Sequence, residues 1–309
     1  MTLIISVTTP EGIVMASDSR QSQRNVKQIT RISTNSAYKL FPLNDRIVVG
    51  IAGLAFFADE NGMQRNVSKY IKDFVKNNDL SSLTVKEVSE KLNSFFNVQY
   101  PWKKQLEQST KQLEVDAQRE GAEVLSIETF SDFVSFKIKQ ANGRIEEGQL
   151  NIEPINILIS GYNLDGNSET YELKSPGDIS LKRPAGQYGS TWVGQGDVVS
   201  RLILGYDSKI LNMPMLQKLR QTTPEEEIVN QLHGVEYNIQ WGLMTLQDAV
   251  DLAVFLIKTT SMIQRYADGV NMDIGEIQGV GGPVDVAVIT PEEGVTWLEK
   301  KKVYYPEDF

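Results

Sequence analysis

The chain has 309 residues, 40% of them hydrophobic and 23% charged, which is an ordinary globular composition with enough apolar material for one large domain or two smaller ones. Its 31 basic and 40 acidic residues give a net charge of −9, which repels phosphate backbones and anionic lipid, so we expect neither nucleic acid nor a membrane as partner. The absence of cysteine excludes thiol catalysis, thiolate metal sites and disulfides.

Nothing in the sequence indicates a targeting or membrane segment. The first residues lack a basic region, and the apolar run at 3–5 is too short for a signal peptide. No stretch is long and apolar enough to span a bilayer. We therefore expect a cytoplasmic protein, and we interpret the lysines at 300–302 as part of a solvated tail.

The first half of the chain begins with strands and continues with helices. Residues 2–9 and 13–18 are rich in β-branched side chains and flank a Pro-Glu-Gly turn, which predicts a hairpin. A third strand is expected to end near 38–41, and 47–52 is a short apolar run typical of a buried strand. A helix is predicted from 54 to 74, and a second from Thr84, with Glu87 completing a capping box and Pro101 interrupting the helix.

In the second half, strands and helices again follow one another in separate blocks. A helix-prone stretch at 102–120 precedes strands at 122–139 and 144–158, joined by an Ala-Asn-Gly turn. Helices are predicted at 197–205, 224–240 and 246–266, then a glycine-rich loop at 268–282 and a strand at 284–289. Strands and helices in separate blocks favour an α+β fold of antiparallel sheets covered by helices. We see no linker and expect a single domain over 1–309.

The predicted N-terminal hairpin brings chemically useful residues together. With the turn centred on Glu11, Ile4 pairs with Asp18 and Thr2 with Arg20, so these four side chains share one face. Diagonal neighbours on a face lie about 7–8 Å apart, and Lys39 on a following strand is long enough to bridge them.

These residue types fit nucleophilic catalysis at an N-terminus. A threonine hydroxyl is a weak nucleophile that needs a base, and a free α-amine titrates at about 7.7–8.0. Because a small second residue permits removal of the initiator methionine, the amine of Thr2 can be that base. A nearby Lys39 ammonium lowers the pKa values of both the amine and the hydroxyl, Asp18 holds that charge in place, and the Gly53 N–H can donate to an oxyanion.

Several stretches of the sequence resemble a known protein family. Residues 2–20, with Thr-Leu-Ile-Ile-Ser-Val-Thr-Thr-Pro-Glu-Gly at their start, resemble the beginning of mature proteasome β subunits. The runs at 39–53, 157–162 and 283–297 resemble later parts of the same family. The likeness covers most of the chain except about 100–150, which we interpret as an insertion. Thr2 falls on the family's nucleophile, Asp18 and Lys39 on its catalytic partners, and Gly53 on its oxyanion glycine.

The resemblance implies more than the residues alone. It implies a four-layer αββα sandwich of two antiparallel sheets, as in N-terminal nucleophile hydrolases, and hydrolysis of peptide or amide bonds through an acyl-enzyme. It also implies assembly into homo-oligomeric rings or related assemblies, and no metal or organic cofactor. An unfoldase partner is not identified by the sequence.

Two positions depart from the family pattern. Gln195, within Gly-Gln-Gly, stands where the family has a serine that supports the nucleophile's amine. Val280 stands where the family has the serine of an Asp-x-x-Ser-Gly-Gly motif, for which Asp268 or Asp273 are possible aspartates. Two other interpretations therefore stay open: a catalytically inactive, ring-forming subunit, and a small-molecule amidase of the same superfamily.

Other catalytic patterns have little support. His233, the one histidine, would have to serve any Ser-His-Asp triad, yet no G-x-S-x-G surrounds a serine, and we interpret it as a solvated helical residue. The glycine-rich segments at 194–196 and 279–282 lack the spacing and the lysine of a phosphate loop.

Overall fold

The computed structural model describes residues 2–24, 29–59, 62–130, 132–267 and 277–302. Helices account for 34% and strands for 33% of the structure, and the sheets are antiparallel, so the fold is mixed α/β and compatible with the expected α+β class. No helix within these ranges combines the length and apolarity needed to cross a membrane.

Two five-stranded antiparallel sheets form the body. The first has the order β15-β1-β2-β16-β17, with β15 (Gly189–Gly194), β1 (Leu3–Thr8), β2 (Ile13–Ser17), β16 (Asp285–Thr290) and β17 (Gly294–Glu299). The second has the order β14-β13-β12-β6-β5, with β14 (Ile179–Arg183), β13 (Ser168–Ser175), β12 (Ile155–Tyr162), β6 (Ile47–Gly53) and β5 (Leu40–Pro42). Strands from both ends of the chain therefore meet in the first sheet.

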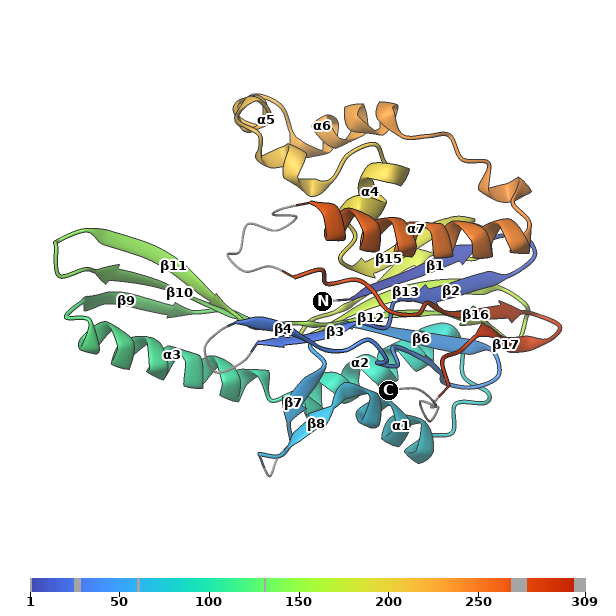
Figure 1. Cartoon of the computed structure of the whole chain (residues 1–309), viewed down its shortest axis with the longest axis horizontal. Coiled ribbons are helices and arrows are strands. Elements are labelled where there is room, and N and C mark those ends of the chain that lie inside the picture. The colour runs from blue at the N-terminus through green and yellow to red at the C-terminus, as the bar shows by residue number, and fades with distance from the viewer. Residues whose placement is uncertain (1, 25–28, 60–61, 131, 268–276, 303–309) are drawn as a thin grey trace, which may run out of the picture.

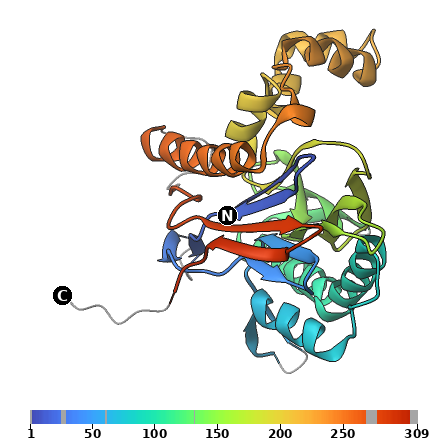
Figure 2. The ribbon, with the colours of Figure 1, turned by 90° about the vertical axis from the view of Figure 1, so that its right-hand side faces the viewer.

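Helices cover one face of each sheet (Figure 1). On the first sheet, α4 (Asp197–Ile203) and α7 (Leu246–Tyr266) bury Val199, Leu256 and Ile257 against apolar residues of β1, β2 and β16. On the second sheet, α1 (Val67–Asn77) and α2 (Val85–Gln99) pack their apolar stripes against β6, β12 and β13. Figure 2 shows the same order of helices and strands from the side.

A third apolar cluster lies between the two sheets. It joins residues of the first sheet to residues of the second, namely Ile4, Ile13, Met15, Val193, Ala287 and Ile289 to Leu40, Val48, Ala52, Leu158 and Tyr162. Alternation along β1 sends Leu3, Ile5 and Val7 to the helix side and Ile4 to the inner side. Because both faces are covered, every residue of β1 is buried.

The region interpreted as an insertion forms its own helix and sheet. Helix α3 (Trp102–Arg119) packs on a three-stranded antiparallel sheet of order β11-β10-β9. Its strands are β9 (Glu123–Thr129), β10 (Phe133–Lys139) and β11 (Ile145–Asn151). Figure 1 shows this unit projecting away from the two large sheets.

The remaining elements are small. Two hairpins flank the body, β3 (Gln21–Arg24) with β4 (Thr30–Thr34), and β7 (Phe56–Ala58) with β8 (Gln64–Asn66). Helices α5 (Pro214–Leu219) and α6 (Glu225–Leu232) follow α4, with short 3₁₀ turns at Ser208–Asn212, His233–Val235 and Trp241–Leu243.

Helix boundaries confirm some expectations and correct others. The capping box of Thr84 and Glu87 is present, α2 ends before Pro101, and α7 spans 246–266 as predicted. The helix predicted from 54 is wrong at its start, because 56–58 and 64–66 pair as strands and α1 begins only at Val67, where Asn66 caps it by accepting from Ser68 N. The helix predicted at 224–240 ends as α6 at Leu232.

The predicted register of the first hairpin is also wrong, by one residue. Ile4 pairs with Ser17 and Thr8 with Ile13, not Ile4 with Asp18. The reason lies in the turn, where Thr9 N donates to Gly12 O over 2.9 Å and closes a loop centred between Pro10 and Glu11. Alternation then no longer puts Thr2 and Asp18 on one face, so any link between them must be made by other groups.

Candidate active site

Thr2 lies just before β1 and is almost completely buried, with 5% of its surface exposed. Its carbonyl oxygen accepts a hydrogen bond from Gln195 N over 2.8 Å, which ties it to the end of β15. A Cβ at Gly194, where φ is +94°, would lie 2.0 Å from the same oxygen. Only glycine therefore permits this close approach. Met1 lies outside the described residues.

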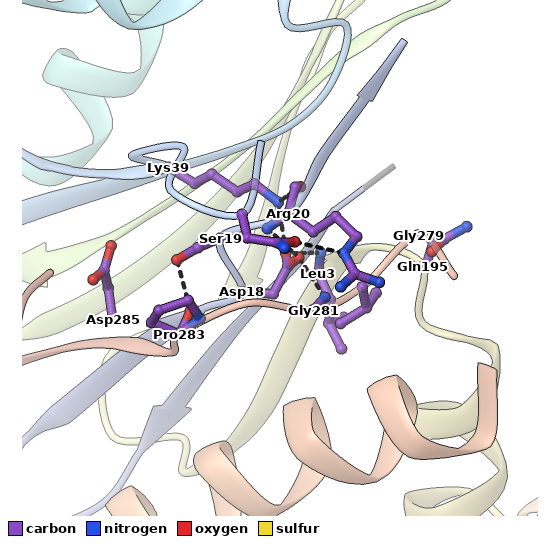
Figure 3. A network of polar contacts seen from close by, with 12 residues as sticks. Leu3, Asp18, Ser19, Arg20, Lys39, Gln195, Gly279, Gly281, Pro283 and Asp285 are labelled. Carbon is purple, nitrogen blue, oxygen red and sulfur yellow. Dashed lines mark hydrogen bonds and ion pairs between the residues drawn. The ribbon is translucent and has the colours of Figure 1, made fainter. Parts of the chain in front are cut away.

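Asp18 accepts four hydrogen bonds at a fully buried carboxylate (Figure 3). Oδ1 receives Leu3 N at 3.0 Å and Lys39 Nζ at 2.7 Å. Oδ2 receives Arg20 N at 3.1 Å and Gly281 N at 3.0 Å. A buried charge needs such compensation. Through Leu3, the carboxylate also holds the residue that follows Thr2.

Lys39 is buried beside Asp18, with 6% of its surface exposed. Its ammonium also donates to the carbonyl oxygen of Arg20 over 2.5 Å, and Ile51 N donates to Lys39 O over 3.0 Å at the start of β5. Burial lowers the pKa of Lys39, the charge and hydrogen bond of Asp18 oppose this, and the positive charge of Arg20 adds to the lowering. The ion pair therefore holds a cation that gives up its proton more readily than an ordinary lysine.

Gly53 ends β6 with φ at +86°. A Cβ at this position would lie 2.3 Å from the Pro154 carbonyl oxygen, so the backbone itself requires glycine. The end of β6 also lies beside the Thr2 segment, because a Cβ at Gly194 would be 3.3 Å from the Cβ of Ala52.

The four candidate residues are thus brought to one end of the two sheets. Asp18 and Lys39 are in direct contact. Thr2 is connected to Asp18 through the N–H of Leu3, and to the end of β6 through Gly194.

Arg20 contacts Asp18 through its backbone and not through its side chain. Its backbone N–H is the partner of Asp18, whereas its guanidinium donates to Asn35 Oδ1 at 2.8 Å and Gln278 Oε1 at 2.6 Å. Gln278 Nε2 in turn donates to the Ser261 carbonyl oxygen on α7 at 2.6 Å. Arg20 therefore links the hairpin to the helix layer.

Gln264 on α7 is a site residue that the sequence analysis missed. Its Nε2 donates to Gln195 Oε1 at 2.9 Å, and its Oε1 accepts from Gly279 N at 3.0 Å and Val280 N at 2.8 Å. It thereby joins the two segments in which the sequence departs from the family pattern. A polar residue on the buried stripe of a predicted helix, one turn after Thr260, was the signal that could have revealed it.

Lys301 corrects another expectation. Its side chain is 7% exposed and forms an ion pair with Asp285, whose side chain is 2% exposed, so this lysine is not part of a solvated tail. His233 is exposed at the end of α6 and contacts Glu236, in keeping with a solvated role. Asp268 and Asp273, considered as substitutes for the family's aspartate, lie outside the described residues.

A polar cleft of about 550 Å³ is lined by residues that contact Thr2 or lie close to Gly53, although Thr2 and Gly53 do not line it themselves. Gly194 and Gln195 line it, and Asn156, another lining residue, has its Nδ2 3.4 Å from the position of a Cβ on Gly53. Its other lining residues come from β13, β15, α4 and the turn after α4: Glu172, Trp192, Val193, Gly196, Asp197, Ser200, Asp207, Ser208 and Lys209. Residues of the cleft wall therefore contact Thr2 and lie close to Gly53.

In the part of the chain that the structure describes, no cluster of three or more His, Asp or Glu side chains is suited to holding a metal ion. No protein-family model matches the chain, and a search of curated proteins finds no match.

Proposed function

We propose that this chain is a threonine-type N-terminal nucleophile hydrolase that cleaves peptide or amide bonds after removal of Met1. The observation that carries the proposal is the buried ion pair of Lys39 and Asp18, whose carboxylate also binds the N–H of Leu3, the residue after Thr2. Buried groups with shifted pKa values cluster at functional sites, and the buried Lys39 ammonium, whose pKa is lowered, is linked through Asp18 to the residue after Thr2.

The fold supports the same proposal. Two antiparallel sheets pack against each other, and each carries helices on its outer face. This order of layers supports our proposal of a four-layer αββα sandwich of the N-terminal nucleophile hydrolase type, which the resemblance to proteasome β subunits implies.

The chemistry follows from the roles of the residues. The Thr2 amine takes the proton of the Thr2 hydroxyl, and Oγ1 attacks the substrate carbonyl carbon. Lys39 lowers the pKa values of the amine and the hydroxyl, and Asp18 keeps Lys39 charged and in place. The Gly53 N–H donates to the oxyanion of the tetrahedral intermediate. The amine group then protonates the leaving nitrogen and activates the water that hydrolyses the acyl-enzyme. In this proposal the substrate is a peptide or amide, and the active form is a cytoplasmic homo-oligomer.

Intact-mass analysis of the purified protein, with and without a threonine-directed epoxyketone, tests the proposal. We expect a mass that begins at Thr2 and a gain of one adduct. Thr2→Ala and Lys39→Ala should abolish the adduct, whereas Lys69→Ala, which changes an exposed lysine on α1, should leave it unchanged. A retained Met1 with no adduct would point to an inactive structural subunit. An adduct on the Thr2→Ala protein would place the nucleophile elsewhere.

The class of substrate can be separated in the same preparation. A peptide library and a set of small acyl amides are incubated with the mature protein, and the products are identified by mass. Cleavage of internal peptide bonds supports a peptidase. Hydrolysis of acyl amides alone would identify a small-molecule amidase.

A further inference from the structure

A second buried ion pair lies next to the first. The ammonium of Lys301 contacts Asp285 Oδ2, and the backbone N–H of Lys301 donates to Asp285 Oδ1 over 2.9 Å. Both side chains are at least nine-tenths buried. Because Lys301 lies just after β17, this double contact fixes the segment that follows the last strand.

The second pair touches the candidate site from two directions. Asp285 pairs across the sheet with Ser17, the residue before Asp18, and it appears beside the Asp18 network in Figure 3. On the other side, the Tyr38 hydroxyl donates to the Lys301 carbonyl oxygen over 3.0 Å, and the Lys301 ammonium is 4.8 Å from the centre of the Tyr38 ring. Tyr38 directly precedes Lys39. Each residue of the catalytic ion pair therefore has a sequence neighbour held by the second pair.

We propose that Lys301 is a positioning residue of the candidate active site, which holds the Tyr38–Lys39 segment in place and contributes a second positive charge near the Thr2 amine. The inference rests on the proposed function, since it assigns a role within the same site.

The charged groups around Lys301 explain how it acts electrostatically on the site. Burial and the positive charge of Lys39 lower the pKa of Lys301 to about 8, and the charge of Asp18 opposes this. The Asp285 carboxylate contacts the same ammonium. The positive charges of Lys39 and Lys301 thus repel each other, and the buried carboxylates of Asp18 and Asp285 balance them. The ring of Tyr38 also faces Lys301, and its face attracts the ammonium.

A purely structural contact would not need this arrangement. An apolar pair in place of a buried ion pair is often equally or more stable, because neither partner has to be desolvated. The Thr2 amine must stay neutral in order to act as a base, and nearby positive charge lowers its pKa. A second ammonium, that of Lys301, beside the Lys39 ammonium supplies such a charge.

The test compares Lys301→Met with Lys301→Arg, using Lys300→Met as the matched control. Lys300 is the exposed neighbour, whose ammonium lies 4.3 Å from the centre of the Trp297 ring. The rate of epoxyketone adduct formation on Thr2 is measured by intact mass from pH 6 to 10, at roughly unit intervals. In parallel, the Lys39 side chain is titrated by NMR in protein containing lysine labelled with ¹³C at Cε, with the resonance assigned by Lys39→Met.

For Lys301→Met we expect labelling of Thr2 to slow by about tenfold or more, as small displacements of catalytic groups do. Removal of a cation, with the Asp285 carboxylate left behind, favours the protonated amine, so the rising limb of the pH profile should move to higher pH by roughly one unit. The pKa of Lys39 should rise for the same reason. Lys301→Arg should restore both properties, and Lys300→Met should match the wild type.

A charge-balanced variant, Lys301→Met/Asp285→Asn, covers the case in which the single variant does not fold, because it leaves no unpaired buried carboxylate. It should label slowly but without the shift to higher pH. Wild-type rate and pH profile in this double variant, or in a folded Lys301→Met protein, would overturn the inference. If wild-type Thr2 takes no adduct while the Lys39 titration still responds to Lys301→Met, the proposed function fails and the coupling stands. An unchanged Lys39 titration would refute the coupling independently of any activity.

Discussion

The ammonium of Lys39 lies 2.7 Å from the carboxylate of Asp18, and both side chains are buried beneath the end of the first sheet. Three backbone N–H groups, from Leu3, Arg20 and Gly281, complete the surroundings of the carboxylate. The chain thus gathers four separate segments around one negative charge. The positions of these segments therefore depend on the charged carboxylate of Asp18.

Asp18→Asn should therefore change both stability and pH dependence. Loss of one partner from a buried ion pair costs about 3–5 kcal/mol, so we expect a clear fall in the unfolding free energy, measured by urea denaturation. Asp73→Asn removes a partly exposed partner of Arg65 and should cost less than about 1 kcal/mol.

The same variant should alter the alkaline limb of Thr2 labelling. Burial lowers the pKa of Lys39 below 10.5, and its ammonium is present below that pKa and lost above it. The labelling rate should therefore fall as the pH rises toward 10.5, earlier than for an ordinary lysine. Since the Asp18 charge raises the pKa of Lys39, Asp18→Asn should move this falling limb to still lower pH. A limb that stays in place would show that Lys39 is not the group that titrates.

Gly53→Ala should lower the unfolding free energy by more than the positive φ of Gly53 alone would cause. A Cβ there lies 2.3 Å from the Pro154 carbonyl oxygen in addition to the positive φ. Gly166 has φ at +81° with no atom within 4 Å of a Cβ, so Gly166→Ala isolates the conformational cost, about 1–2 kcal/mol. We expect Gly53→Ala to cost a further ~1–3 kcal/mol from crowding, measured by thermal and urea unfolding. An equal loss of unfolding free energy in the two variants would mean that the backbone at Pro154 moves away from the added Cβ at no cost.

Gln264→Leu should weaken the link between α7 and the Thr2 segment. It leaves the N–H groups of Gly279 and Val280 without their acceptor, at a cost of about 1–3 kcal/mol for each buried donor. It also removes the contact with Gln195, whose backbone N–H holds the Thr2 carbonyl, so Thr2 labelling should slow. Gln247→Leu, on an exposed position of the same helix, is the control and should leave both quantities within experimental error. Unchanged labelling in folded Gln264→Leu would show that Gln195 is held by its backbone alone.

Replacement of residues 103–151 by a short Gly-Ser linker should leave the two large sheets folded. The unit has its own helix and sheet, and its ends are close, because the Tyr100 hydroxyl donates to the Glu153 carbonyl oxygen over 2.8 Å. A linker of about four residues spans roughly 13 Å. Circular dichroism and a cooperative unfolding transition check this outcome. Aggregation of the shortened chain, despite intact Trp102 and Ile152, would show that the unit is needed for folding.

Local patterns in the sequence determined much of what was predicted. The capping box at Thr84 and Glu87 and the helical spacing along 246–266 arise from contacts between residues close in sequence, and the structure has both. The resemblance to proteasome β subunits, together with the predicted hairpin, indicated that Thr2, Asp18, Lys39 and Gly53 belong to one site. In the structure, Asp18 and Lys39 are in contact.

Turn conformation and tertiary contacts decided the rest. The hairpin register follows from the turn, which one local hydrogen bond between Thr9 and Gly12 closes and which composition does not reveal. Gln264 and Lys301 acquired partners 69 and 16 residues away, Gln195 and Asp285, and a long polar side chain has the same local signature whether it ends in solvent or in a buried network. Distant partners become visible only when the sheets and helices are packed, because burial removes water as the alternative partner.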